Sequence, residues 1–260
     1  MADLKGKRAL ITGASSGIGE ACARAFAAEG AHLVLVARRA ERLGRLAAEL
    51  EQTHRIEVLA SGLDVRDGEA VEAFVGGLTA PWRALDILVN NAGLARGLTG
   101  VQSGDTADWD EMIDTNVKGL LYVTRAVLPR MVERRAGHVI NIGSIAGHEA
   151  YPNGAVYCAT KHAVAALTRA AGMDLLGTGV RVSSVDPGMV ETEFSVVRFH
   201  GDDERAAAVY RGIVPLAAAD VADAVLYCAT RPPHANVREM VLMPSAQASA
   251  VHAWREGSGG

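Results

Sequence analysis

Seven short runs rich in β-branched residues and leucine recur along this 260-residue chain, and they constrain its fold more than any other feature. The runs are nearly continuous in apolar residues, which is typical of parallel strands buried on both faces of a sheet. Longer stretches with helical character separate them, so the pattern predicts an α/β fold, a doubly wound parallel sheet with helices on both faces. In chain order the runs are RALIT, HLVLVA, IEVLAS, LDILVN, GHVINIG, VRVSSVDP and EMVLMP, starting at residues 8, 32, 56, 85, 137, 180 and 239.

The stretches between these runs predict one domain that spans residues 1–260. At this length, and with 49% apolar residues, the chain can bury one sizeable core, and no repeat or low-complexity linker divides it. The last four residues, GSGG, are expected to form a frayed end. Helices are expected at 18–30, 40–52, 68–78, 108–135 and 155–177.

Composition argues against macromolecular partners and metal centres. The formal charge of -4 is spread along the chain, and only short basic pairs such as Arg134 and Arg135 interrupt it, so neither nucleic acid nor a membrane is an expected partner. Three scattered cysteines, Cys22, Cys158 and Cys228, are interpreted as reduced packing residues, and no Cys/His cluster has metal-ligand spacing. The chain passes early into a strand pattern, and no apolar run reaches membrane-spanning length. We therefore expect a cytoplasmic protein that binds a small molecule and no metal.

A glycine-rich loop joins the first predicted strand to the first predicted helix. The segment LITGASSGIGEA places Gly13, Gly17 and Gly19 where a bare backbone can turn tightly against a pyrophosphate, next to the unpaired N–H groups of the helix start. Strand, loop and helix follow in the order that a dinucleotide site requires. The Gly-x-Ser-x-Gly pattern around Ser15 is also typical of α/β-hydrolases, but too few residues precede it to supply the earlier strands of that fold.

The end of the second predicted strand indicates which dinucleotide binds. NAD sites place an acidic residue there for the ribose hydroxyls, whereas this chain has Arg38 and Arg39 and no Asp or Glu from 36 to 40. A guanidinium fork suits a 2′-phosphate, so we predict NADP(H) as the cofactor, although two arginines at a helix start can also be simply solvated. Asp64, after the third strand, is expected to accept from the adenine amino group or to cap the next helix.

Tyr157 and Lys161 are spaced i, i+4 and share one face of a predicted helix. A phenol with a pKa near ~10 needs a preference of ~4 kcal/mol for its anion to titrate ~3 units lower, and one ammonium at about 4 Å supplies roughly that at an effective dielectric of about 20. Ser144, at the end of the fifth strand, is placed to donate a hydrogen bond to a substrate oxygen. The arrangement predicts that Tyr157 gives or takes a proton while Ser144 orients a carbonyl.

Six motifs extend in order over nearly the whole chain: TGASSGIG (12–19), NNAG (90–93), Asn116 in DTNVKG, Ser144 in IGSIAG, YCATK (157–161) and DPGMVET (186–192). Together they resemble the short-chain dehydrogenase/reductase family, in its single-domain branch. The resemblance implies a Rossmann-like seven-stranded sheet of order 3-2-1-4-5-6-7 and a homotetramer whose subunits pair through long helices. It also implies that Tyr157 is the general acid/base and that Ser144 polarises the carbonyl.

The same resemblance assigns the remaining site residues. Lys161 would bind the nicotinamide ribose and lower the pKa of Tyr157, and Asn116 would hold a water that relays protons to Lys161. Asn90 and Gly93 would line the adenosine side of the cofactor. The full set of implied cofactor contacts is Gly13, Ser15, Ser16, Gly17, Ile18, Gly19, Arg38, Arg39, Asp64, Val65, Asn90, Ala92, Gly93, Tyr157, Lys161, Pro187, Gly188, Val190 and Thr192.

The substrate pocket in this family is built by residues 148–154 and by a lid, here at about 190–212, with a C-terminal tail at about 246–260. Both the lid and the closing segment look like those of NADP-dependent 3-hydroxy acid dehydrogenases, which act on serine, allo-threonine or 3-hydroxypropionate, and of semialdehyde reductases. A carboxylate needs a cation, and we hypothesise that Arg198 in the lid supplies it, with a solvated lid arginine as the alternative. Two alternatives stay open: a broad carbonyl reductase for uncharged ketones or aldehydes, and a non-catalytic NADP-binding protein.

Overall fold

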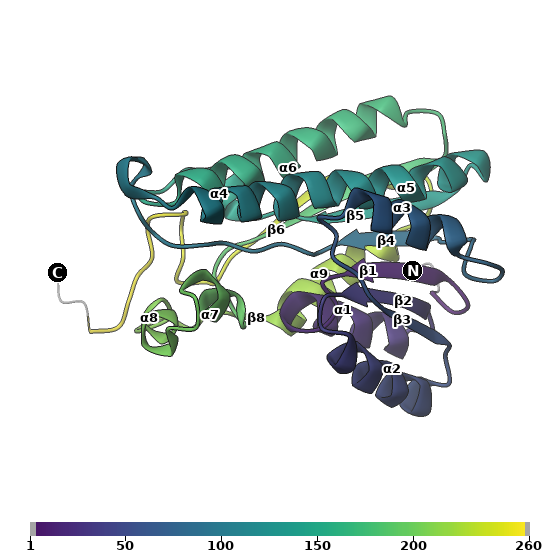
Figure 1. Cartoon of the computed structure of the whole chain (residues 1–260), viewed down its shortest axis with the longest axis horizontal. Coiled ribbons are helices and arrows are strands. Elements are labelled where there is room, and N and C mark those ends of the chain that lie inside the picture. The colour runs from purple at the N-terminus through teal and green to yellow at the C-terminus, as the bar shows by residue number, and fades with distance from the viewer. Residues whose placement is uncertain (1–3, 258–260) are drawn as a thin grey trace.

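The computed structural model of the protein describes residues 4–257 and is built around one seven-stranded parallel sheet (Figure 1). The sheet has the order β3-β2-β1-β4-β5-β6-β9, so the predicted order is confirmed. The seventh strand is β9 because two short strands, β7 (Val190–Glu191) and β8 (Leu216–Ala217), pair separately as a two-stranded sheet. The long strands are β1 (Arg8–Thr12), β2 (His32–Ala37), β3 (Val58–Gly62), β4 (Ile87–Asn90), β5 (Gly137–Ile142), β6 (Val180–Pro187) and β9 (Glu239–Leu242).

Helices cover both faces of the sheet, as expected (Figure 1). One apolar core joins α1, α2 and α9 to the sheet, and a second joins α3 and α5 to its other face. The α-helices are α1 (Gly17–Ala28), α2 (Ala40–His54), α3 (Gly68–Gly77), α4 (Thr106–Ile113), α5 (Leu120–Glu133), α6 (Ala155–Asp174), α7 (Phe194–Arg198), α8 (Asp203–Ala208) and α9 (Ala218–Ala229). No helix between residues 4 and 257 is long and apolar enough to span a bilayer.

Outside the lid and the short strand β8, the structure differs from the sequence analysis in the helices that follow β4 and β8. The stretch expected as one helix over 108–135 is divided by a π-helical segment, Asp114–Gly119, which widens the backbone between α4 and α5. Helix α9 was not predicted at all, although its buried residues follow a helical spacing.

The expected lid at about 190–212 contains β7, α7 and α8. Because β8 pairs with β7 in parallel, the chain before α7 and the chain after α8 lie next to each other. Of the expected C-terminal tail, residues 246–257 are described, with a bridge between Gln247 and Ala253. Residues 258–260 of the expected frayed end lie outside the described residues.

Candidate active site

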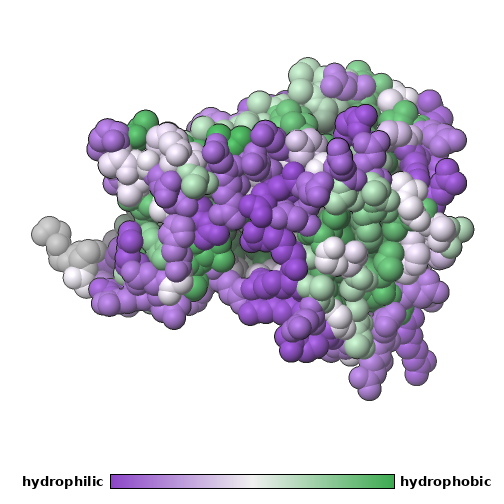
Figure 2. Space-filling view, in the orientation of Figure 1, coloured by the Kyte–Doolittle hydropathy of each residue, from purple (hydrophilic) through white to green (hydrophobic). Residues whose placement is uncertain are grey.

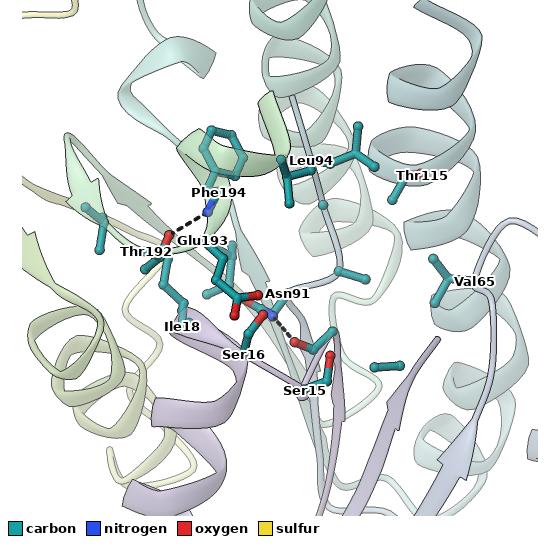
Figure 3. Close-up of a pocket in the computed structure, with 18 of the residues that line it drawn as sticks. Ser15, Ser16, Ile18, Val65, Asn91, Leu94, Thr115, Thr192, Glu193 and Phe194 are labelled. Atoms are coloured by element: carbon teal, nitrogen blue, oxygen red, sulfur yellow. Dashed lines mark hydrogen bonds between the residues drawn. The ribbon is translucent and has the colours of Figure 1, made fainter. Parts of the chain in front are cut away.

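A cavity of about 340 Å³ lies at the carboxyl ends of the central strands (Figure 3). Parallel strands bring their carboxyl ends to one edge of the sheet, which is why loops distant in sequence meet here. Figure 2 shows hydrophilic side chains gathered over the middle of the molecule, on the face that Figure 1 displays. Most of the predicted site residues line the cavity: Gly13, Ser15, Ser16, Gly17, Ile18, Arg38, Arg39, Asp64, Val65, Ala92, Gly93, Ser144, Tyr157, Lys161, Pro187, Gly188, Val190 and Thr192.

Two predicted cofactor residues lie outside this lining. Asn90 is expected to line the adenosine side of the cofactor, but its side-chain amide donates to Asn141 at 2.9 Å and to Thr124 at 2.8 Å. These hydrogen bonds connect β4 to β5 and α5. Gly19 packs against the glycine loop instead, since a Cβ at this position would lie 2.4 Å from the carbonyl oxygen of Gly13.

Asn116 also lies outside the lining and is held by protein groups. Its amide donates to the Leu94 carbonyl at 2.8 Å and to the Thr160 hydroxyl at 3.0 Å, while its Oδ1 accepts from the Leu94 N–H at 2.8 Å. The side chain therefore fixes the loop after β4 to helix α6. It stays close to Lys161, because a Cβ built on Gly93 would lie 3.3 Å from Asn116 Oδ1 and 3.7 Å from Lys161 Nζ.

Sequence reasoning missed part of the lining. Asn91 stood inside the NNAG motif, yet its role is visible only in the fold, where its amide donates to the carbonyl of Thr12 at 2.9 Å and holds the end of β1. Glu193 follows a predicted residue but reaches across to the glycine loop near Ser16 (Figure 3). The missed lining residues are Ala37, Leu63, Asn91, Leu94, Thr115, Ile142, Gly143, Glu193, Phe194 and Val197.

Ser144, Tyr157 and Lys161 come together as predicted, and all three are buried. The Ser144 oxygen accepts from the N–H of Ala146 at 3.1 Å, which fixes the serine where β5 ends. Lys161 Nζ donates to the carbonyl of Ile142 at 2.9 Å and lies 5.9 Å from the centre of the Tyr157 ring. Tyr157 and Lys161 share the cavity-facing side of α6 because they are one helical turn apart.

The electrostatics of this group differ from the sequence expectation. Burial raises the pKa of Tyr157, while the positive charge of Arg198 and a hydrogen bond with Ser144 act in the lowering direction. Burial also lowers the pKa of Lys161 to about 8, against the opposing charge of Asp186. Burial is thus the largest influence on the Tyr157 pKa among the described residues, and the cation that acts against it is Arg198. The lowering of this pKa by Lys161 beside a bound nicotinamide stays a prediction.

Arg198 lies at the end of α7 and reaches the same group of residues. Its guanidinium carbon is 5.2 Å from the centre of the Tyr157 ring and 5.1 Å from that of Phe194, and its Nη2 donates to the Tyr151 hydroxyl at 3.1 Å. Within residues 4–257 its buried Nε has no hydrogen-bond partner, and no carboxylate pairs with it. The structure thus brings the predicted lid cation beside the predicted acid/base.

At the other end of the cavity, exposed ion pairs surround the predicted phosphate-binding arginines. Arg39 donates to Ser15, to Ser16 and to Glu193, with the last contact at 2.7 Å, and Arg42 contacts the same carboxylate at 2.6 Å. These contacts lower the pKa of Glu193. Among residues 4–257, the guanidinium of Arg38 contacts Glu111 alone, at 3.4 Å, so much of its donor capacity is available.

Asp64 pairs with a neighbouring arginine, and a different residue caps the helix that follows. Its carboxylate pairs with Arg66 at 2.6 Å, and this contact lowers the pKa of Asp64. The helix that follows is capped by Asp67, whose side chain accepts from the N–H of Ala70 at 2.9 Å. Asp64 still lines the cavity beside Val65.

Behind Ser144 lies a cluster of side chains that the sequence did not connect. His148 Nε2 is 2.8 Å from Asp186 Oδ2 and 3.6 Å from Glu239, and Arg169 lies 3.7 Å from the same glutamate. The ligand atoms of His148, Asp186 and Glu239 are within 4.8 Å of one another, the one grouping of possible metal ligands in the described chain. Arg169 pairs with one of the two carboxylates and His148 contacts both, so the cluster forms an ion-pair network beside β6.

The residues present fit a dinucleotide. Gly13 and Gly17 have φ of 65° and 55°, a conformation that favours glycine, and a Cβ on Gly13 would lie 2.9 Å from the backbone of Ala92. The buried hydroxyl of Thr115 lines the cavity and has no hydrogen-bond partner among residues 4–257. A ligand that lies along the glycine loop would use the close approach that these glycines allow, with an anionic group near Arg38. Its polar groups would give the Thr115 hydroxyl a hydrogen-bond partner.

Fold and site together define a dinucleotide-dependent oxidoreductase. The sequence pattern of the short chain dehydrogenase family matches residues 7–202. The chain is 49% identical to sulfoacetaldehyde reductase 2 of Chromohalobacter salexigens, over 94% of this chain and 96% of that protein. It is 48% identical to the NADP-dependent 3-hydroxy acid dehydrogenase YdfG of Salmonella typhi, over 93% of this chain and 96% of that one.

Solved structures agree with these relatives. The closed form of a serine dehydrogenase complexed with NADP+ superimposes with a TM-score of 0.90 and 45% identity, covering 96% of this chain and all of that one (100%). The protein belongs to the short-chain dehydrogenase family, as the six sequence motifs predicted. The names of the relatives also agree with the NADP(H) predicted from Arg38 and Arg39.

Proposed function

We propose that the protein is a single-domain NADP(H)-dependent oxidoreductase that interconverts a hydroxyl and a carbonyl on a small anionic substrate. The expected substrates are 3-hydroxy acids of the serine, allo-threonine or 3-hydroxypropionate type, or the corresponding semialdehydes. One observation carries the proposal: Arg198 lies 5.2 Å from the Tyr157 ring, without a carboxylate partner among the described residues. A half-buried cation beside the acid/base is suited to a substrate that brings its own negative charge.

The relatives support the same substrate class. Sulfoacetaldehyde, 3-hydroxy acids and serine, the compounds in their names, each carry an anionic group near the carbon that is oxidised or reduced. The cofactor end supports NADP(H), because Arg38 and Arg39 stand where an acidic residue would select NAD.

The chain's own residues have separable roles in the reaction. When bound, the cofactor supplies or accepts the hydride. Ser144 donates a hydrogen bond to the substrate oxygen, and Tyr157 gives that oxygen its proton during reduction. The raised pKa of Tyr157 keeps the phenol protonated at neutral pH, which suits a proton donor. For oxidation, the charge of Arg198 and the hydrogen bond with Ser144 ease the loss of the same proton.

The test compares acids with neutral analogues. The purified enzyme is assayed by NADPH absorbance with serine, with 3-hydroxypropionate and with the methyl ester of the latter, using NADP and NAD in turn. We expect NADP to be preferred and Arg198→Met to raise the KM for the acid about 10- to 100-fold, the scale of a lost charge-assisted contact. Arg205→Met, which removes a lid arginine stacked on Phe199 instead, is the matched control.

Three outcomes decide between the readings. A strong preference for the acid that Arg198→Met abolishes supports the proposed substrate class. Equal rates with acid and ester, before and after the substitution, would show a broad carbonyl reductase for uncharged substrates. A Tyr157→Phe variant with wild-type turnover would instead show a protein that binds NADP without using this catalytic group.

The cellular setting is part of the proposal. Cys22, Cys158 and Cys228 are all buried and unpaired, which supports a reducing compartment such as the cytoplasm. A homotetramer is supported by the family resemblance and by exposed apolar side chains on the helices that were expected to pair, including Leu121 on α5 and Met173 on α6. Sedimentation of the purified protein would measure the mass of the assembly.

A further inference from the structure

Arg96, on the loop after β4, connects the substrate lid to the body of the protein. Its Nη1 donates to the carbonyl of Val197 at 2.5 Å, and its Nε donates to Glu111 on α4 at 2.7 Å. The next residue, Gly97, donates its N–H to the carbonyl of Arg198 at 2.8 Å. Two consecutive residues of the loop therefore hold the last two carbonyls of α7.

These contacts lie in a protected setting. The side chains of Arg96 and Glu111 are 16% and 19% exposed, far less than the ion pairs of Arg39 and Arg42 with Glu193, at 43% and 44%. An ion pair shielded from water in this way keeps its geometry better than a solvated one. Arg96 thus forms a well-ordered link between α4 and α7.

The two arginines beside the substrate site differ in what their charges face. The guanidinium of Arg96 pairs with Glu111 at 2.7 Å, nearer than Arg38 and Arg66, which contact the same carboxylate at 3.4 Å. Arg198 contacts only the neutral Tyr151 hydroxyl and two aromatic rings among the residues that the structure describes. Arg198 is therefore the group with charge to offer an anion, and Arg96 is suited to hold the segment that carries it.

Space around the pair is narrow. A second cavity, of about 20 Å³, is lined by Arg96, Arg198, Tyr151, Trp109 and Tyr157, and it offers room for about one water molecule. The Arg198 side chain has little volume to move into while Arg96 is in place. Removing the Arg96 side chain would release the end of α7 and open the space beside the Arg198 guanidinium.

We propose that Arg96 is a positioning residue that fixes Arg198 over Tyr157 and thereby determines the preference of the enzyme for anionic substrates. The inference rests on the proposed function, in which Arg198 binds the anionic group. Arg96 acts through Arg198 and does not touch the reacting atoms.

The kinetic arm uses Arg96→Gln, Arg198→Met, the double variant and Arg205→Gln as the matched lid control. We expect Arg96→Gln to raise the KM for 3-hydroxypropionate about tenfold, with kcat and the KM for the methyl ester changed less than about threefold. In the Arg198→Met background, Arg96→Gln should change the KM by less than about twofold, because the group that it positions is already gone. Equal effects on acid and ester, or effects that multiply in the double variant, would overturn the inference.

The second arm needs no substrate. Hydrogen exchange is followed over residues 194–199 in the full-length protein, with and without Arg96→Gln. We expect exchange there to quicken about tenfold, since the anchored carbonyls end α7, and to stay unchanged in Arg205→Gln. Should Arg96→Gln not fold, Arg96→Lys serves in both arms. A lysine keeps one charge but loses the planar fork that spans Glu111 and Val197, so smaller shifts in the same direction are expected.

The two arms separate the failure of this inference from that of the proposed function. A wild-type enzyme that does not prefer the acid overturns the proposed function, and the specificity role of Arg96 with it. A wild-type preference for the acid together with unchanged exchange and an unchanged KM in Arg96→Gln overturns the role of Arg96 alone.

Discussion

The two ends of the cavity hold their charges in opposite ways. At the end of the cavity predicted to hold adenosine, Arg38, Arg39 and Arg42 are about half exposed. Arg39 and Arg42 pair with the exposed Glu193, and Arg38 contacts the more buried Glu111 at 3.4 Å. At the catalytic end, Tyr157 and Lys161 are buried, and burial shifts the pKa of each toward its neutral form. Exposed pairs contribute little to stability and are screened by salt, whereas buried groups titrate according to their surroundings. One end is therefore adapted to capture a charged ligand and the other to move a proton.

The largest effect is expected at the buried end. The pKa of Lys161, lowered to about 8, means that its ammonium is present below that pH and is lost above it. We expect Lys161→Met to reduce kcat/KM for carbonyl reduction about 100-fold or more, and the wild-type rate to fall as the pH rises through about 8. Lys161→Arg, whose guanidinium stays charged, should lose this fall in the pH–rate profile. A profile with the same fall in Lys161→Arg would show that another group titrates there.

The exposed end should respond to charge and salt instead. Arg38 has only one long contact, so Arg38→Ser is expected to raise the KM for NADPH about 10- to 100-fold and to leave that for NADH unchanged. The wild-type KM for NADPH should rise with ionic strength, and that of the variant should rise less. Arg45→Ser, at an exposed position on the following helix α2, is the control. Equal losses for the two cofactors would show that Arg38 does not meet the 2′-phosphate.

The smallest effect is expected for Glu193, which occupies Arg39 and Arg42 with its carboxylate. Glu193→Gln weakens that competition, so NADPH should bind about two- to fivefold more tightly, the modest scale of exposed ion pairs. Titration of NADPH fluorescence measures the Kd, with NADH as the reference ligand and Glu41→Gln as the variant control. Tightening that is the same for NADH would assign the effect to the lid rather than to the phosphate.

Local sequence patterns predicted most of the fold because each strand carries its own signal. RALIT, HLVLVA and VRVSSVDP match β1, β2 and β6 residue for residue. Helix α9 carried a usable signal as well, in the spacing of Val221, Val225 and Cys228, and was overlooked. The π-helical segment at 114–119 has no comparable signature, since its widened turn depends on what packs around Asn116.

The site was predictable where function depends on residue type and not where it depends on packing. Ser144, Tyr157 and Lys161 were found because their spacing is local once the strands are placed. The direction of the tyrosine pKa was not, because it depends on burial under Phe194 and on the charge of Arg198, both from the lid. The contacts of Glu193 with Arg39 and of Arg96 with Val197 could not be predicted, because these partners are 154 and 101 residues apart in the sequence.

The pairing of β7 with β8 has a consequence for how such enzymes diversify. Val190 lies opposite Leu216, so the chain departs from and returns to one fixed place, the small β7–β8 sheet. Whatever is inserted between these two points starts and finishes in register with the rest of the fold, at a closure cost that grows only slowly with length. The segment between β7 and β8 can therefore be replaced as a unit, and the substrate preference can change while the main sheet keeps its structure.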